Sequence, residues 1–383
     1  MSTTPFDFSP QPAKATVAFV RYLLVLCVLL VLTACGDGDQ PEQDSDTPAY
    51  PPLQALGQLR VTNGQFRDFA ALNNYLYIAA GFDGLQVIDV RDLMAPRQVG
   101  AIPHSSPGGA YDQVVAVAVV SSTLIVSVYP GCSGFCQPSS GELRFYDLTT
   151  PTEPRFIGVL PTAAYSFSVD QTTVFALGPT SGFPSLSSSL RVIDIASPSL
   201  SRVVATISVA NATRLATQRT RLFLSFSDRS GGSPGLQVVD VSDPRAPAVV
   251  GIAGNPSSEA GTNDVAADST AVFTASGTAQ LLSYPTSGAF NNPTSTSLQR
   301  EGSGLALSGR LLLVAQADLG VAVFWRDAGT GITRQNNFSV DGTCIGIRAL
   351  GGYGVARVAA VRTNGATGNL IRPERLVLFA LPQ

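Results

Sequence analysis

The six residues Leu85-Gln86-Val87-Ile88-Asp89-Val90 return, with variation, along this chain of 383 residues. Clear copies begin at Leu143, Leu190 and Leu236, and weaker copies span residues 279–284, 321–326 and 376–381. A sequence that repeats on this scale indicates a solenoid, a propeller or a similar array, in which each repeat packs against its neighbours.

The spacing of the repeats favours a propeller. The Asp position of each copy serves as a phase marker, and the markers are Asp89, Asp147, Asp194, Asp240, Ser283, Trp325 and Ala380. Successive markers are 58, 47, 46, 43, 42 and 55 residues apart, which brackets the ~40–50 residues of a four-stranded propeller blade. We therefore predict an all-β fold, a seven-bladed β-propeller of four-stranded blades. Six or eight blades are the alternatives if the weak copies mislead.

Short apolar runs bounded by Gly, Asn, Asp and Ser predict the strands. In the first unit these runs are residues 69–72, 75–79, 85–90 and 98–102. The last unit supplies only three runs, at 344–350, 355–361 and 376–381, whereas residues 54–61 form an extra run before the first unit. We expect this N-terminal run to be the outer strand of the last blade, because pairing it there closes the ring and removes an exposed sheet edge.

Composition agrees with a large β fold. The chain is 45% hydrophobic and 13% charged, and its 36 Gly and 26 Pro suit many tight turns. The net charge is −3, from 24 basic and 27 acidic residues, with no basic run. We therefore expect no nucleic-acid partner.

The N-terminus has the pattern of a secretory signal. Lys14 and Arg21 precede an apolar run that ends at Thr33-Ala34. This run is shorter than the ~20 apolar residues of a membrane-spanning helix. The junction Leu32-Thr33-Ala34-Cys35 resembles the lipobox of bacterial lipoproteins. That resemblance implies cleavage before Cys35 and acylation of this residue, which would anchor the chain to a membrane. The alternative is an uncleaved anchor helix with an incidental cysteine.

These features divide the chain into three parts. Residues 1–34 are predicted to be a lipoprotein signal peptide, 35–52 a flexible acidic and Pro-containing tether, and 53–383 the propeller. Gly36 follows the cysteine, and by the enterobacterial sorting pattern this resemblance favours the outer membrane, on its periplasmic or surface face.

The repeat resembles a known family. The Leu-Gln-Val-Ile-Asp-Val strand, followed in the fourth unit by Asp243-Pro244 and Pro247, is similar to the LVIVD-repeat family of bacterial surface propellers. The resemblance covers roughly residues 57–382 and implies an architecture and an envelope location, but no reaction and no fixed catalytic residues. We expect Asp89, Asp147 and Asp240 to accept hydrogen bonds from backbone N–H groups of the following turn.

Few residues suggest catalysis. His104 is the only histidine and falls in a predicted loop, so neither a catalytic triad nor a zinc or haem site is expected, and no metal or cofactor is predicted. Cys132 and Cys136 are expected to form a disulfide in an exported protein, with a redox pair as the alternative. Cys344 falls in a predicted inner strand and is expected to be a buried free thiol.

A candidate ligand site lies where the inner strands begin. Aligning the units by their first turn places one residue of each at an equivalent position: Asp68, Ala116, Ser166, Arg214, Asp264, Ser303 and about Gly346. Inner strands line the axis of a propeller, so Asp68, Arg214 and Asp264 could hold an ion or a small polar ligand at the channel mouth. The alternative is a ring of solvated turn residues around a water-filled channel.

These features predict a lipid-anchored bacterial envelope β-propeller that acts as a non-enzymatic scaffold for binding a protein or a ligand. Its expected partners are the membrane, through lipidated Cys35, and an envelope protein or surface ligand. The predicted loops at 104–112, 129–140, 178–189 and 228–234 offer a recognition surface. One alternative is a propeller enzyme, a hydrolase or quinone-dependent oxidoreductase, and another is a structural or adhesive surface protein.

Overall fold

The computed structural model describes residues 52–60, 66–103, 112–129, 141–162, 164–179, 188–209, 211–226, 235–254, 262–288, 290, 292–327, 330–350, 352–359, 361–362, 370–372 and 374–382. The predicted signal peptide, Cys35, the tether up to residue 51, His104, Cys132 and Cys136 lie outside these residues. Within the described ranges, no helix is long and apolar enough to span a membrane.

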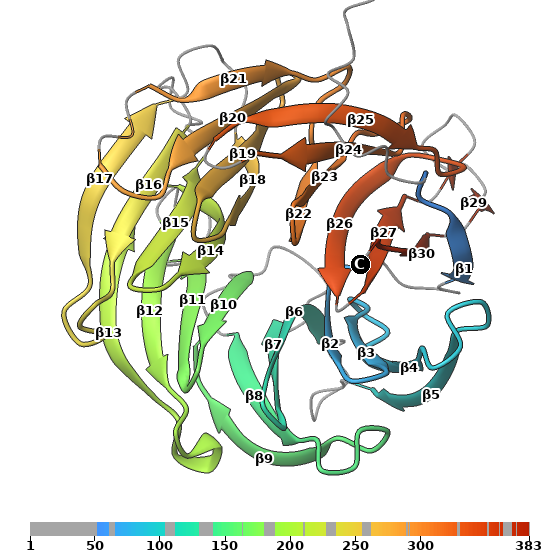
Figure 1. Cartoon of the computed structure of the whole chain (residues 1–383). Helices are drawn as coiled ribbons and strands as arrows, with labels where there is room; N and C mark the ends of the chain where they lie inside the picture. The colour runs from blue at the N-terminus through green and yellow to red at the C-terminus, as the bar shows by residue number, and fades with distance from the viewer. Residues whose placement is uncertain are drawn as a thin grey trace, which may run out of the picture. The chain divides into compact units, whose positions relative to one another are not determined.

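The described chain forms seven four-stranded antiparallel sheets arranged as the blades of a ring (Figure 1). The first four blades are β2 (Asp68–Leu72), β3 (Tyr75–Ala79), β4 (Leu85–Asp89) and β5 (Arg97–Ile102); β6 (Gln113–Val120), β7 (Thr123–Tyr129), β8 (Glu142–Asp147) and β9 (Arg155–Leu160); β10 (Ser166–Asp170), β11 (Thr173–Pro179), β12 (Ser188–Asp194) and β13 (Arg202–Val209); and β14 (Ala212–Gln218), β15 (Arg221–Phe226), β16 (Gly235–Asp240) and β17 (Ala248–Gly254).

The last three blades follow the same plan. They are β18 (Thr262–Ala267), β19 (Ala271–Ser276), β20 (Gln280–Pro285) and β21 (Thr294–Ser297); β22 (Gly304–Ser308), β23 (Leu311–Ala315), β24 (Val321–Arg326) and β25 (Ile332–Phe338); and β26 (Cys344–Leu350), β27 (Tyr353–Val358), β30 (Arg375–Ala380) and β1 (Ala55–Arg60). A two-stranded ribbon, β28 (Val361–Arg362) with β29 (Leu370–Arg372), and a 3-10 turn, η2 (Pro198–Leu200), complete the described elements. The prediction of seven blades is confirmed.

The N-terminal strand closes the ring as predicted. β1 pairs antiparallel with β30, from Ala55 opposite Phe379 to Arg60 opposite Arg375. Leu59 packs on a buried cluster that joins Phe69 and Ile78 of the first blade to Leu376 and Leu378 of the seventh. The two ends of the propeller are therefore held in one sheet and one core.

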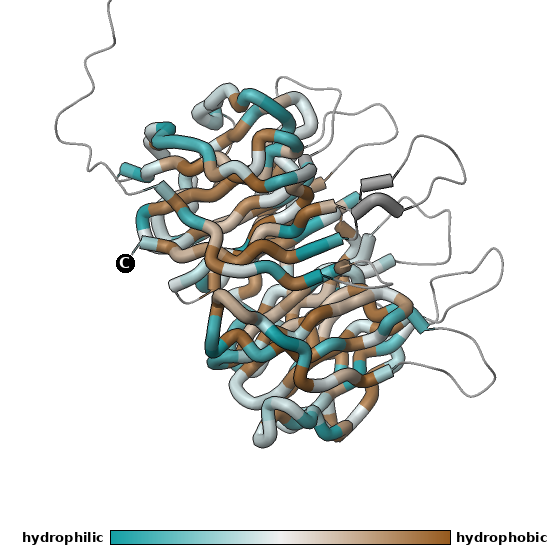
Figure 2. The backbone as a smooth tube through the Cα atoms, turned by 90° about the vertical axis from the view of Figure 1, so that its right-hand side faces the viewer, coloured by the Kyte–Doolittle hydropathy of each residue, from teal (hydrophilic) through white to brown (hydrophobic). Residues whose placement is uncertain are grey.

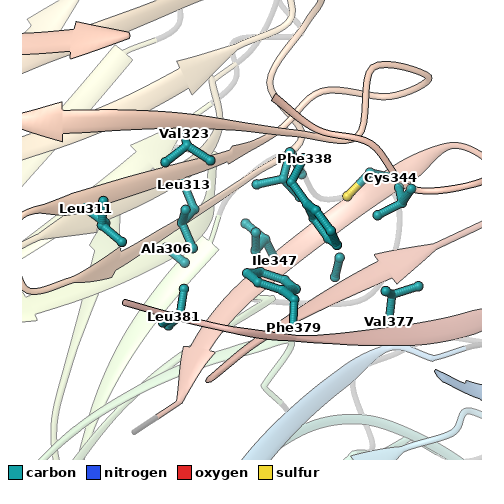
Figure 3. Packing of buried hydrophobic residues seen from close by; sticks show 14 of the residues in the cluster. Ala306, Leu311, Leu313, Val323, Phe338, Cys344, Ile347, Val377, Phe379 and Leu381 are labelled. Carbon is teal, nitrogen blue, oxygen red and sulfur yellow. The ribbon is translucent and has the colours of Figure 1, made fainter. Parts of the chain in front are cut away.

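The core lies between neighbouring blades. Figure 2 shows apolar residues following the strands, while polar residues occupy many of the turns. Between the sixth and seventh blades, Leu313 and Val323 pack with Ile347 and Phe379 (Figure 3). β4 is buried on both faces, so apolar residues occupy its adjacent positions Val87 and Ile88.

The prediction that Cys344 is a buried free thiol is confirmed. It is a free, buried thiol in the cluster between the sixth and seventh blades (Figure 3). Burial raises the pKa of this thiol to about 12. A thiol with so little thiolate at neutral pH is a packing residue rather than a nucleophile.

One phase marker is wrong. The first residue of the second strand faces the marker in the other blades, as Tyr75 faces Asp89 and Leu311 faces Trp325. In the fifth blade Ala271 faces Pro285, so the marker lies at Pro285 and not at Ser283. The aspartate that fixes the phase in the first four blades is absent there, and β20 pairs with β21 without the irregularity of β4 with β5.

The repeated aspartates accept backbone hydrogen bonds from the turn that follows them, as expected from the sequence. The Oδ1 atoms of Asp89, Asp147 and Asp240 accept hydrogen bonds from the backbone N–H groups of Arg91 (3.0 Å), Thr149 (2.9 Å) and Ser242 (2.8 Å). Asp89 is only 4% exposed and forms ion pairs with the Arg91 and Arg97 guanidinium groups at 2.6 and 3.2 Å.

These hydrogen bonds stabilise the ionised carboxylates. Side-chain and backbone hydrogen bonds from Arg91 hold the pKa of Asp89 well below its usual range. The backbone N–H groups of Thr149 and Ser242 lower the pKa of Asp147 and of Asp240. The folded chain therefore prefers all three residues in their charged forms.

Acidification is consequently expected to destabilise the folded chain. A carboxyl whose pKa is lower in the folded than in the unfolded chain stabilises the fold above its unfolded pKa of about 4, and this contribution is lost as the pH falls toward the folded value. We expect the melting temperature to be steady above about pH 5 and to fall progressively below about pH 4. Thermal unfolding followed by circular dichroism over this range measures the effect.

The Asp89→Asn variant tests the origin of this acid sensitivity. It should melt at a lower temperature at neutral pH and lose less stability on acidification than the wild type. Glu153→Gln, at an exposed turn position, is the matched control and should keep the wild-type profile. Equal acid profiles for Asp89→Asn and the wild type would contradict the assignment.

Candidate functional site

A cavity of about 320 Å³ opens at one end of the axial channel. Its wall is formed where inner strands begin, and the lining includes Asp68 of β2, Ser166 of β10, Arg214 of β14, Asp264 of β18 and Gly346 of β26. The inner strands lie nearest the centre of the ring in Figure 1. The structure thus brings Asp68, Arg214 and Asp264 to one cavity, although these residues are far apart in the sequence.

The predicted ring of equivalent residues needs one correction. Strand pairing places Asp264 opposite Ala275, and in the sixth blade the equivalent pair is Gly304 with Ala315. Gly304, rather than Ser303, therefore occupies the equivalent position, although both line the cavity. The error is one residue because no aspartate or tight sequence match fixes the phase of this blade.

Gly304 allows two inner strands to approach each other closely. A Cβ atom at this position would lie 3.0 Å from the Cα atom of Gly346 and 3.1 Å from the backbone nitrogen of Ile347. The sixth and seventh blades therefore meet at the axis through two residues without side chains. Ala116 of the second blade is buried beside the cavity and does not line it.

Asp264 joins the fifth blade to the sixth. Its Oδ2 atom accepts a hydrogen bond of 2.8 Å from the backbone N–H of Leu305, and its Oδ1 atom accepts one of 2.9 Å from that of Val265. The residue is 6% exposed. Both oxygens of this carboxylate are therefore engaged by the backbone.

Asp68 makes the corresponding contact between the first and second blades. Its Oδ2 atom accepts a hydrogen bond of 3.2 Å from the backbone N–H of Val117, which follows Ala116 as Leu305 follows Gly304. Its Oδ1 atom lies 3.6 Å from an Nη atom of Arg348 in the seventh blade. Asp68 thus contacts both neighbouring blades.

Arg348 is a site residue that the sequence alignment missed. It lies in the cavity wall, and its side chain is 42% exposed. Burial disfavours its charged form, but Asp68 and Asp264 outweigh that effect and raise the pKa of Arg348 above its usual value. The equivalent residues of the other inner strands are small: Ala70, Ala118, Ser168, Ala216, Ala266 and Ala306. This single departure from the repeat is the signal that could have identified Arg348.

Two further arginines line the cavity. Arg67 precedes Asp68 and is exposed, whereas Arg357 of β27 donates a hydrogen bond of 2.6 Å to the buried Glu374. Arg214 donates a hydrogen bond of 3.1 Å from Nη1 to the carbonyl oxygen of Thr213. The lining therefore holds four guanidinium groups and two carboxylates, a cationic wall and not the acidic one that a metal ion would need.

No group of three or more His, Cys, Asp or Glu side chains that could hold a metal ion occurs among the described residues. The sequence-based expectation about metals stays a prediction.

The predicted loops at 104–112, 129–140, 178–189 and 228–234 lie largely outside the described residues, but the strand ends that precede them lie on the face of the ring that carries the cavity. On this face the inner strands begin and the second and fourth strands of each blade end, as Asp68 lies opposite Ala79 and Leu85 opposite Ile102. The last described residues before these loops belong to the ends of β5, β7, β11 and β15. The cavity and the ends of these strands therefore share one face.

Comparison with known proteins supports the repeat and the fold. The model of the LVIVD repeat family matches residues 63–102 and 232–253, which cover all four strands of the first blade and part of the fourth blade. Among curated proteins, no relative matches this chain.

Solved structures with a similar fold are distant in sequence. Raptor from Chaetomium thermophilum matches with a TM-score of 0.61 and 10% identity over 87% of this chain, which spans 29% of the Raptor chain. A chain of the mitotic checkpoint complex matches with a TM-score of 0.62 and 12% identity, over 91% of this chain and 98% of that one. The WD40 repeats of RRP9 match with a TM-score of 0.62 and 12% identity, over 88% and 99%. At such low identity these likenesses show the fold alone.

Proposed function

We propose that this protein is a lipid-anchored β-propeller of the bacterial envelope that acts as a non-enzymatic scaffold for binding a protein or a ligand. The observation that carries the proposal is the use of the two axial carboxylates. Asp264 and Asp68 each accept a backbone N–H bond from the next blade, so both serve to join blades. A general acid or base needs a carboxyl free to reach the substrate.

The closed ring gives this scaffold a fixed binding face. β1 and β30 join the two ends of the propeller, and buried clusters fill the spaces between blades. A rigid frame that carries a cavity at one end is a common arrangement for recognition. This frame and the structural use of its acidic groups support the proposed scaffold function.

The partner is sought by crosslinking in intact cells, followed by capture of the tagged protein from the solubilised envelope. We expect a specific protein or ligand to be recovered with the wild type and not with an unrelated lipoprotein carrying the same tag. Recovery of no specific partner would count against a scaffold. A catalytic turnover that is lost in a correctly folded cavity variant would indicate an enzyme instead.

The envelope location is proposed on the resemblance of residues 32–35 to a lipobox. Fractionation of cells that express the wild type or Cys35→Ser tests it. We expect the wild type in the membrane fraction, with a lipid-modified N-terminal peptide by mass spectrometry, and the variant without that modification. An unmodified Cys35 in the wild type would refute lipid anchoring while leaving the scaffold itself untouched.

A further inference from the structure

The charges of the cavity wall are unevenly paired. Of its two carboxylates, Asp68 forms an ion pair with Arg348, and Asp264 also contributes to the electrostatic stabilisation of Arg348. Arg357 is paired with Glu374 through a hydrogen bond of 2.6 Å. Asp68, Asp264 and Glu374 therefore interact with Arg348, Arg357 or the backbone.

Arg214 and Arg67 are the cations left over. Among the described residues neither has an ion-pair partner, and the Arg214 guanidinium donates a hydrogen bond to the neutral carbonyl oxygen of Thr213. Arg214 also breaks the pattern of its ring, because the equivalent residues of the other blades are aspartate, serine, alanine or glycine. Like charges that line one cavity repel one another, and a bound anion would relieve that repulsion.

Guanidinium groups suit one kind of ligand. The planar fork of arginine donates two parallel hydrogen bonds to a carboxylate or a phosphate, and such charge-assisted bonds are stronger than neutral ones. The cavity volume of about 320 Å³ lies at the small end of the range for small-molecule sites, which is roughly 300–1,000 Å³. It therefore fits one small molecule better than a folded partner's surface.

We infer that the cavity at the channel mouth binds a small organic anion, with Arg214 and Arg67 contacting its carboxylate or phosphate group. Ser166 and Ser303 also line the cavity and would offer hydroxyl oxygens as acceptors to polar groups on the rest of the molecule. The inference rests on the proposed scaffold function and names the chemistry of its ligand.

Isothermal titration calorimetry of the full chain in nonionic detergent at low ionic strength tests the inference, because charge interactions are least screened there. The probes are glucuronate, which carries a carboxylate, glucose 6-phosphate, which carries a phosphate, and neutral glucose. We expect saturable binding of at least one acidic probe and none of glucose. Which acidic probe binds more tightly identifies the preferred group.

The variants locate the binding. Arg214→Gln should lower the affinity for the bound probe about tenfold or more, as expected for loss of a charge-assisted hydrogen bond. If this variant is unstable, Arg67→Gln provides a second measurement. Arg155→Gln is the matched control, because this side chain lies on β9 and is 77% exposed. Its affinity should stay within about twofold of the wild type.

Three results would overturn the inference: no saturable binding of either acidic probe by the folded wild type, equal binding of glucose, or unchanged affinity in both cavity variants. Capture of a protein partner that requires Arg214, without binding of any small anion, would assign the cavity to an acidic side chain of that protein. That outcome refutes the small-molecule ligand but keeps the scaffold function, which the crosslinking experiment tests separately.

Discussion

A chain that begins at Phe66, and therefore lacks β1, is expected to lose most of its stability. β1 supplies the outer strand of the seventh blade, with five residue pairs in register against β30. An antiparallel pair of strands makes about one hydrogen bond for each residue pair. At a net contribution of about 1 kcal/mol for each hydrogen bond, the loss of this pairing costs on the order of 5 kcal/mol. That is a large part of the ~5–15 kcal/mol that holds a typical domain folded. Leu59 would also leave the core between the first and seventh blades.

The truncation should also change the association state of the protein. Without β1, the backbone of β30 becomes an exposed sheet edge, and such edges pair with other chains. Thermal unfolding and size-exclusion chromatography of the full chain, a chain beginning at residue 52 and a chain beginning at Phe66 measure both effects. The second chain is the control and should melt like the first. If the chain beginning at Phe66 is monomeric and has the same melting temperature as the chain beginning at residue 52, β1 does not close the ring.

The number of blades and their closure could be predicted because they depend on local patterns. Apolar runs separated by turn residues mark nearly every strand, and the unpaired run at 54–61 had to find a partner in the incomplete last unit. The errors at Ser283 and Ser303 fall where the repeated aspartate is missing. In those blades the equivalent positions can be assigned only from which residues pair across neighbouring strands. That pairing is known only once the chain is folded.

The candidate site was predictable only in part. One aligned column found Asp68, Arg214 and Asp264, because equivalent positions in a ring meet at its axis. Arg67 and Arg348 come from other columns of the repeat and Arg357 comes from a second strand, β27, yet all three line the same cavity. The backbone partners of Asp68 and Asp264 belong to neighbouring blades, so the role of these carboxylates depends on how closely the blades approach.

Asp264→Ala is expected to destabilise the ring more than Asp68→Ala. Asp264 is 6% exposed and accepts two backbone N–H bonds, at 2.8 and 2.9 Å. Removing the carboxylate leaves two buried donors unpaired, at about 1–3 kcal/mol each, or about 2–6 kcal/mol in all. The side chain of Asp68 is 21% exposed and accepts one such bond, at 3.2 Å, so water can replace it and the loss should be about 1–2 kcal/mol.

Urea unfolding of the two variants and of Asp264→Asn distinguishes a structural from a functional carboxylate. Asn keeps one acceptor oxygen, so its loss of stability should lie between those of the wild type and Asp264→Ala. Groups held in place for binding or catalysis usually cost stability, and their removal is neutral or stabilising. If Asp264→Ala is as stable as the wild type, the carboxylate is kept for its chemistry and the case for a non-enzymatic scaffold weakens. If stability falls in the order expected, Asp264 serves to hold neighbouring blades together, and ligand recognition in the cavity is left to the arginines.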